Sequence, residues 1–170
     1  MNMQKIFWYT FASASCLMGA RNHAIPFLKY FLKPVITVTS KEYEDKIQYT
    51  AYLKQRISGR VYGTAVFTYY TKTQTGMLVN LRINRAQQNK GHGSRLLKFA
   101  LATFIKKHPE CAVVKLMAKP LDVNYAQGET AADVFPKLVA FYKRNNAHIA
   151  FIDNELSIAE MEFRRTESYA

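Results

Sequence analysis

Apolar and polar side chains alternate through much of the first half of the chain. Between Ile47 and Leu53 every second residue is apolar, a period of two that is typical of a half-buried strand. Pairs that contain Gly59 and Gly76 mark turns between such segments, and a run of β-branched residues follows Pro34. Because the connections are short, the pattern indicates an antiparallel meander. Four strands are predicted: residues 35–39, 46–55, 60–71 and 77–84.

The spacing of apolar residues changes to a helical period in residues 93–107. Lys106 and Lys107 lie in the last turn, where the carbonyl end of the helix dipole favours cations, and Pro109 stops the helix. This segment is therefore predicted to be an amphipathic helix. Its apolar stripe consists of Leu96, Leu97, Ala100, Leu101, Phe104 and Ile105.

The last third of the chain contains strand, loop and helix signals in turn. Residues 111–118 form a mostly apolar run between two prolines, which predicts a strand inside the sheet that is buried on both faces. Residues 120–135 have no sustained period and are expected to form a long loop. Pro136 is expected to open a short helix that ends at Asn145. A hairpin should follow, made of residues 147–152 and 156–164.

The composition supports a folded domain with an anionic ligand. The 170 residues are 49% hydrophobic and 21% charged, which argues against a disordered chain and against a multi-span membrane protein. The 24 Lys and Arg residues exceed the 12 acidic residues, and the net charge of +12 attracts partners that carry phosphate. Cys16 and Cys111 have no metal-site spacing, so neither structural zinc nor a disulfide framework is expected.

Residues 1–33 form a segment that is apolar and carries only basic charges, since Glu42 is the first acidic residue. Its uncharged run from Ile6 to Ala20 is shorter than the roughly 20 residues that cross a bilayer, so no membrane span is expected. We interpret the segment as apolar helices packed on a domain at 34–170, in a cytoplasmic protein. A secretory signal, an organelle presequence and an upstream extension of the gene model, with translation starting at Met18, are the alternatives.

Residues 81–97 carry the most informative motif, because a strand ends there, a glycine-containing bend follows and a helix begins at once. Gly91 and Gly93 allow close approach of the backbone, and the unpaired N–H groups at a helix N-terminus attract phosphate. No Gly-Lys-Ser/Thr of a P-loop is present, and Leu96 replaces the third glycine of a dinucleotide-binding motif. The sequence therefore predicts a diphosphate site built mainly from backbone amides.

In these residues the chain resembles the GNAT superfamily of acetyl-CoA-dependent N-acetyltransferases. Residues 88–93 match the family's Gln/Arg-x-x-Gly-x-Gly/Ala pyrophosphate loop, and the Phe141-Tyr142 pair matches its aromatic-Tyr pair in a later helix. The resemblance extends over residues 46–164. It implies an α/β (α+β) fold with a mixed, mostly antiparallel central sheet of about six to seven strands, flanked by helices.

The resemblance also implies the ligand and the residues that would act on it. Acetyl-CoA would be the acetyl donor, and no metal is implied. A backbone N–H near Ile83 would stabilise the tetrahedral oxyanion, and Tyr142 would protonate the departing CoA sulfur as general acid. The implied cofactor-binding residues are Leu81, Ile83, Gln88, Asn89, Lys90, Gly91, His92, Gly93, Ser94 and Arg95.

The acceptor side departs from the family pattern. The family places two helices between its first and second strands, whereas few residues separate residue 39 from residue 46 here. The family's frequent glutamate before the loop is also missing, so no general base is identified. The polar positions there are held by Asn80, Arg82 and Asn84. Loop carboxylates that could act as a base, though a solvated loop position is their commoner role, are Asp122, Glu129 and Asp133. The histidines for which the sequence shows no partner are His23, His108 and His148.

Three functions follow from these observations. The favoured one is an N-acetyltransferase that acts on a small-molecule or peptide amine. A basic nucleic-acid-binding module with aromatic stacking is the alternative from another class, although the sequence contains no recognisable nucleic-acid motif. The missing glutamate keeps a third function open, a domain that binds CoA without catalysis.

Overall fold

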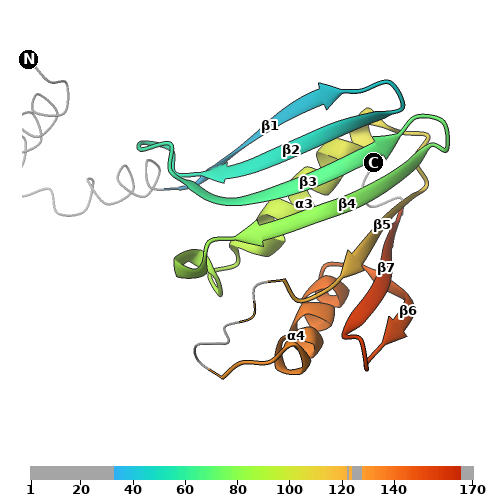
Figure 1. Cartoon of the computed structure of the whole chain (residues 1–170). Coiled ribbons are helices and arrows are strands. Elements are labelled where there is room, and N and C mark those ends of the chain that lie inside the picture. The colour runs from blue at the N-terminus through green and yellow to red at the C-terminus, as the bar shows by residue number, and fades with distance from the viewer. Residues whose placement is uncertain (1–32, 122, 124–127, 166–170) are drawn as a thin grey trace, which may run out of the picture.

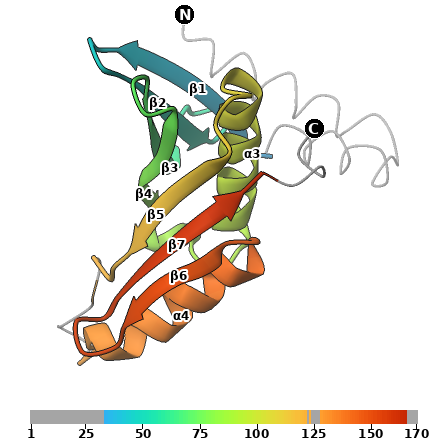
Figure 2. The ribbon, with the colours of Figure 1, turned by 90° about the vertical axis from the view of Figure 1, so that its right-hand side faces the viewer.

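A computed structural model of the chain describes residues 33–121, 123 and 128–165, which form a seven-stranded sheet and two α-helices (Figure 1). The strand order is β1-β2-β3-β4-β5-β7-β6, and only the β4–β5 pair is parallel. Both helices pack on the same face of this twisted sheet (Figure 2). The fold is therefore the mixed, mostly antiparallel sheet that the resemblance implies.

The predicted meander and the predicted C-terminal hairpin are confirmed. The first strand is longer than predicted, because its pairing with the second strand continues to Glu42. The strands are β1 (Val35–Glu42), β2 (Lys46–Lys54), β3 (Val61–Tyr70), β4 (Thr75–Ile83), β5 (Val113–Ala118), β6 (His148–Asp153) and β7 (Ile158–Arg164). The helices are the 3₁₀ turn η1 (Arg85–Gln87), α3 (His92–Lys107) and α4 (Ala131–Arg144).

A three-residue turn joins β1 to β2, so no helix stands between these two strands. The departure from the family pattern that the sequence shows at this point is therefore real. The interpretations of residues 1–32, as well as the candidates His23 and Asp122, fall outside the described residues. No helix within residues 33–121, 123 and 128–165 is long and apolar enough to cross a membrane.

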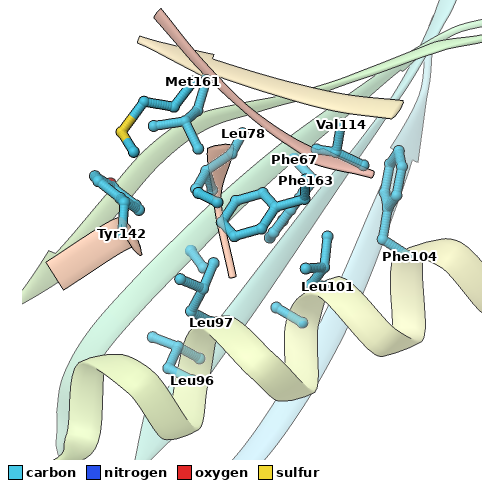
Figure 3. Packing of buried hydrophobic residues seen from close by; sticks show 14 of the residues in the cluster. Phe67, Leu78, Leu96, Leu97, Leu101, Phe104, Val114, Tyr142, Met161 and Phe163 are labelled. Carbon is cyan, nitrogen blue, oxygen red and sulfur yellow. The ribbon is translucent and has the colours of Figure 1, made fainter. Parts of the chain in front are cut away.

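The core lies between the sheet and α3, and all six residues of the predicted apolar stripe are buried in it. Figure 3 shows Leu97 and Leu101 of α3 pointing toward the strands, together with Phe67 from β3 and Phe163 from β7. Because β7 lies beyond the parallel β4–β5 pair, this core joins the meander to the C-terminal hairpin. Burial of these side chains is the main favourable contribution to folding.

The prediction that β5 is buried on both faces is wrong. Val114, Leu116 and Ala118 are buried, whereas Lys115 and Met117 on the opposite face are exposed. β5 does lie inside the sheet, between β4 and β7. The apolar Met117 made the run look two-sided, although the helices cover only one face of the sheet.

The predicted start of the last helix at Pro136 is also wrong, because α4 begins five residues earlier at Ala131. Thr130 and Asp133 form a capping box, in which each side chain bonds the other residue's backbone N–H, at 3.2 and 2.9 Å. The Thr-x-x-Asp spacing is a helix-start signal that the search for apolar periodicity missed.

His108 has partners that the sequence does not show. Its ring is buried at the end of α3, with Nε2 2.9 Å from the Tyr49 hydroxyl and Nδ1 3.2 Å from a Glu110 carboxylate oxygen. The ring also stacks on Tyr69, at a centroid distance of 3.8 Å. These contacts connect the C-terminus of α3 to β2 and β3.

Candidate functional site

The loop between β4 and α3 is folded back onto the end of β4. The Asn84 N–H donates to the Tyr62 carbonyl at 2.8 Å, and the chain then turns through η1. The Gln88 side-chain amide donates to the Ile83 carbonyl at 3.1 Å. The Gln88 side chain therefore holds the loop against the end of β4.

The N-terminus of α3 leaves its backbone donors available. Gly91 is the N-cap in a left-handed conformation (φ 75°), and no side chain caps the helix. Within the described part of the chain, the amides from Asn89 to Ser94 donate to no backbone carbonyl. The first turn of α3 has no acidic residue that would compensate the positive end of the dipole. These conditions are those of an anion site at a helix N-terminus.

The basic side chains around these amides have contacts of their own. Lys90 donates through Nζ to the Ala86 carbonyl at 2.8 Å, and Arg95 donates through Nη2 to the Pro34 carbonyl at 2.9 Å. Burial lowers the pKa of His92, and the charges of Arg95 and Lys90 lower it further. The centroids of the His92 and Tyr62 rings lie 5.9 Å apart. These side chains add positive charge near the amides while they support the loop.

The C-terminal half of α4 packs against the start of α3. A Cβ at Gly93 would stand 3.3 Å from the Phe141 ring, so the missing side chain lets the two helices approach. The buried side-chain amide of Asn145 donates to the Ser94 hydroxyl at 3.1 Å and to the Phe141 carbonyl at 2.8 Å. The structure thus brings together the two motifs that carry the resemblance. Sequence reasoning missed Asn145, because nothing local to it signals a partner 51 positions away.

Tyr142 lies one residue beyond Phe141 and points into the core. Its side chain is 6% exposed, and Figure 3 shows it directed into the cluster that Leu78 and Met161 also enter. Burial raises the pKa of Tyr142 to about 12. The hydroxyl therefore keeps its proton throughout the neutral range.

The parallel strands β4 and β5 separate close to this region. Their pairing extends only from Gly76 to Leu78 on β4, and Figure 1 shows the strands diverging beyond it. The register with β3 shifts at the same point, because Val79 is an extra residue between two paired positions. The remainder of β4, from Val79 to Ile83, thus has an edge that β5 does not cover. We call this segment the free edge of β4.

The side chains along the free edge divide between the two faces of the sheet. Leu81 and Ile83 are partly buried against the core, so their side chains pack while their backbone lies at the free edge. Asn80 and Arg82 are exposed. In the β3–β4 register they stand opposite Val66 and Thr64, on the face without helices.

Of the carboxylates suggested as general bases, Asp122 lies outside the described residues and Asp133 has a structural role. The Asp133 carboxylate accepts bonds from the Thr130 N–H and hydroxyl, which lower its pKa, so its role is to cap α4. The structure does not single out Glu129 as a base. Among the described residues, no group of His, Cys, Asp and Glu could hold a metal ion.

Comparisons with known proteins agree with this geometry. A model of the acetyltransferase (GNAT) family matches residues 27–144. An acetyltransferase from Bacillus cereus has a TM-score of 0.52 at 15% identity, over 85% of this chain and 88% of that one. An acetyltransferase from Bacillus subtilis, solved in complex with CoA, has a TM-score of 0.52 at 13% identity, over 79% of this chain and 100% of that one. A nourseothricin acetyltransferase has a TM-score of 0.50 at 14% identity, over 78% and 84% of the two chains. No curated protein sequence matches the chain.

Proposed function

The chain belongs to the acetyltransferase (GNAT) family, and from this premise we propose that it transfers an acetyl group from acetyl-CoA to an amine. One observation carries the proposal: the amides at the N-terminus of α3 are free of backbone partners in the described chain, next to Ile83 at the end of the free edge of β4. A diphosphate and an extended acyl-carrying arm need these two features next to each other. The solved relative in complex with CoA supports the same ligand.

The backbone amides from Asn89 to Ser94 would hold the diphosphate of acetyl-CoA, whereas the Gln88 N–H already donates to the Arg85 carbonyl. Several N–H groups that point out of a helix start suit an anion, and the positive end of the α3 dipole adds to the attraction. Lys90 and Arg95 would strengthen the local positive potential without leaving their carbonyl partners. His92, whose pKa is lowered by burial and by the neighbouring Arg95 and Lys90 charges, would add a hydrogen-bonding group.

The free edge of β4 would bind the arm that carries the acetyl group. β5 does not pair with this segment, so an extended chain that contains amides can pair with its open backbone groups as a strand would. The Ile83 carbonyl at its end already accepts from the Gln88 side chain. One N–H along this edge would donate to the thioester oxygen and stabilise the oxyanion of the tetrahedral intermediate. A single preorganised donor of this kind is worth about 3 kcal/mol.

Tyr142 would act as the general acid in the transfer. The amine nitrogen attacks the carbonyl carbon and forms a tetrahedral intermediate, whose collapse breaks the C–S bond and leaves the electron pair on sulfur. The Tyr142 hydroxyl donates its proton to that sulfur, and the proton lost by the amine returns through water to the phenolate. Since Asn80 stands on the strand where the family often has a glutamate, water rather than a carboxylate would carry the proton from the amine.

Two glycines in the same left-handed conformation provide a test of the cofactor site. Gly91 (φ 75°) lies in the loop and Gly59 (φ 67°) in the β2–β3 turn, and a Cβ on either would meet nothing within 4 Å. Gly91→Ala and Gly59→Ala should each lose about 1–2 kcal/mol of stability through left-handed strain. Acetyl-CoA should raise the melting temperature of the unchanged protein and of Gly59→Ala, and should raise that of Gly91→Ala much less.

The same preparations should release CoA from acetyl-CoA when small-molecule and peptide amines are supplied, as measured with a thiol reagent. Stabilisation by acetyl-CoA without acetylation of any amine would show a CoA-binding domain that lacks catalysis. Absence of stabilisation, or equal stabilisation of the two glycine variants, would contradict the proposed site.

A further inference from the structure

The sheet ends at β6, and this edge strand exposes large apolar side chains. Ile149, Phe151 and Ile152 are 39%, 56% and 40% exposed. In the register with β7, Phe151 stands opposite Glu160 on the face without helices, whereas Ile149 and Ile152 stand on the other face. β6 has no further strand beyond it among the described residues. An exposed apolar edge of this kind favours pairing with another strand.

The opposite edge of the same sheet shows what a protected edge looks like in this protein. The exposed residues of β1 are all polar or charged, and Lys41 is among them. Lysine and proline are the residues that commonly prevent edge strands from pairing. From Asn145 to Phe163 the chain contains no Lys, Arg or Pro, although its net charge is +12. The β6 edge therefore lacks the protection that the β1 edge has.

A bulge in β6 makes this strand complementary to itself. Ala150 is an extra residue in the pairing with β7, so His148, Phe151 and Asp153 share the helix-free face. If two β6 strands run antiparallel about a twofold axis at Phe151, and Ala150 is bulged out of the new pairing on both strands, His148 stands opposite Asp153 and Ile149 opposite Ile152. Phe151 then stands opposite its own copy. Without the bulge, His148 and Asp153 would lie on different faces and could not pair in this way.

We propose that β6 pairs with β6 of a second copy of this chain, so that the two sheets join across a twofold axis at Phe151. An antiparallel pair of identical strands is an isologous contact, which closes as a dimer. On the helix-free face, Phe151 pairs with its own copy and His148 with Asp153. On the other face, Ile149 pairs with Ile152, so each of these positions has a matching partner. This inference does not depend on the proposed transferase activity.

Phe151→Lys tests the interface with little risk to the monomer, because the new side chain would face Glu160 in the register with β7. Sedimentation velocity over a range of concentrations should give the mass of two chains for the unchanged protein and of one chain for Phe151→Lys. Thr37→Lys, at an exposed position of the β1 edge, is the matched control and should remain a dimer. A monomeric unchanged protein, or a Phe151→Lys variant that is still dimeric, would overturn the proposal.

The register can be tested separately by cross-linking. This experiment also tests the proposal if the circular dichroism spectrum shows that Phe151→Lys is unfolded. Ile149→Cys and Ile152→Cys are prepared singly and then mixed under mild oxidation, with the unchanged chain as the background. The proposed register places these two positions opposite each other, so the mixture should form at least several-fold more disulfide-linked dimer than either variant alone. Equal yields in the mixture and in the single preparations would rule the register out.

Discussion

The Tyr142 hydroxyl carries its proton throughout the neutral range, because burial raises its pKa to about 12. The same shift makes it a weaker proton donor than an exposed tyrosine, so the proposed role depends on its fixed position rather than on its pKa. Phe141, the residue before Tyr142 on α4, packs against Gly93 at the start of α3. This contact places Tyr142 on the turn of α4 that lies next to the glycine loop. A surface tyrosine would also be protonated at pH 7, but it would not be held in one position.

Tyr142→Phe should therefore reduce kcat by about 100-fold or more while the KM for acetyl-CoA changes little, since general acid catalysis contributes 10²–10⁴-fold. Steady-state rates of CoA release measure both constants. Tyr49→Phe is the control, because it removes a buried hydroxyl that bonds His108 at the far end of α3. That variant should lose about 1 kcal/mol of stability and keep its kcat. An unchanged kcat in Tyr142→Phe would remove the proposed acid.

At the scale of elements, the candidate site depends on how α3 and α4 meet. The N-terminus of α3 carries the amides, and the end of α4 carries the Phe141-Tyr142 pair. Asn145 is the polar link between them, since its amide bonds both Ser94 and the Phe141 carbonyl. A buried amide that loses such partners costs more than the bonds themselves contribute.

Asn145→Ala should lower stability by about 1–3 kcal/mol and weaken acetyl-CoA binding, because it releases the start of α3 from α4. Ser94→Ala should cost about 1 kcal/mol, and the two changes together should cost less than their sum, by about 0.5–1.5 kcal/mol. Urea denaturation of the four proteins measures this coupling, and calorimetric titration measures the affinity for acetyl-CoA. Simple additivity would show that the two residues do not act on each other.

Most elements are predictable because each depends on residues close to it in sequence. The stripe from Leu96 to Ile105 and the alternation from Ile47 to Leu53 are periods that one helix or one strand imposes on its own residues. The two errors have different causes. The exposed face of β5 depends on a missing helix layer, which no local pattern shows, whereas the early start of α4 is encoded locally by the Thr130–Asp133 capping box.

At the scale of the whole molecule, one core connects the meander with the C-terminal hairpin although β4 and β5 pair at only three positions. Phe163 from β7 is fully buried in the same cluster as Phe67 from β3 and Leu101 from α3. The proposed ligand site needs β4 and β5 to separate, which removes hydrogen bonds between these strands. Packing of side chains between the sheet and α3 holds the two parts of the sheet together instead.

Phe163→Ala should destabilise the protein by about 3–5 kcal/mol, which is typical of a buried phenylalanine. Because the core is shared, unfolding should remain a single transition, and hydrogen exchange should become faster in α3 as well as in β7. Circular dichroism during urea denaturation and residue-resolved exchange check the two expectations. Loss of protection confined to β6 and β7 would mean that the hairpin unfolds on its own.

The candidate site was predictable only in part, because only some of its features depend on residues that are close together in sequence. The glycine loop and the Phe-Tyr pair are short motifs, so residues 88–93 and 141–142 stand out in the sequence. The free edge of β4 and the Asn145 link depend on contacts between distant positions. No local pattern encodes them.

The sequence by itself determined the strands of the meander, the amphipathic α3, and a loop whose amides suit a diphosphate, because periodicity and turn chemistry act over a few neighbouring residues. Only the tertiary structure decided that β4 and β5 separate after Leu78, that Tyr142 is buried with its pKa raised, and that β6 ends the sheet with an apolar edge. Each of these depends on which surfaces are covered once the chain has folded. Coverage is a property of packing between segments that lie far apart along the chain.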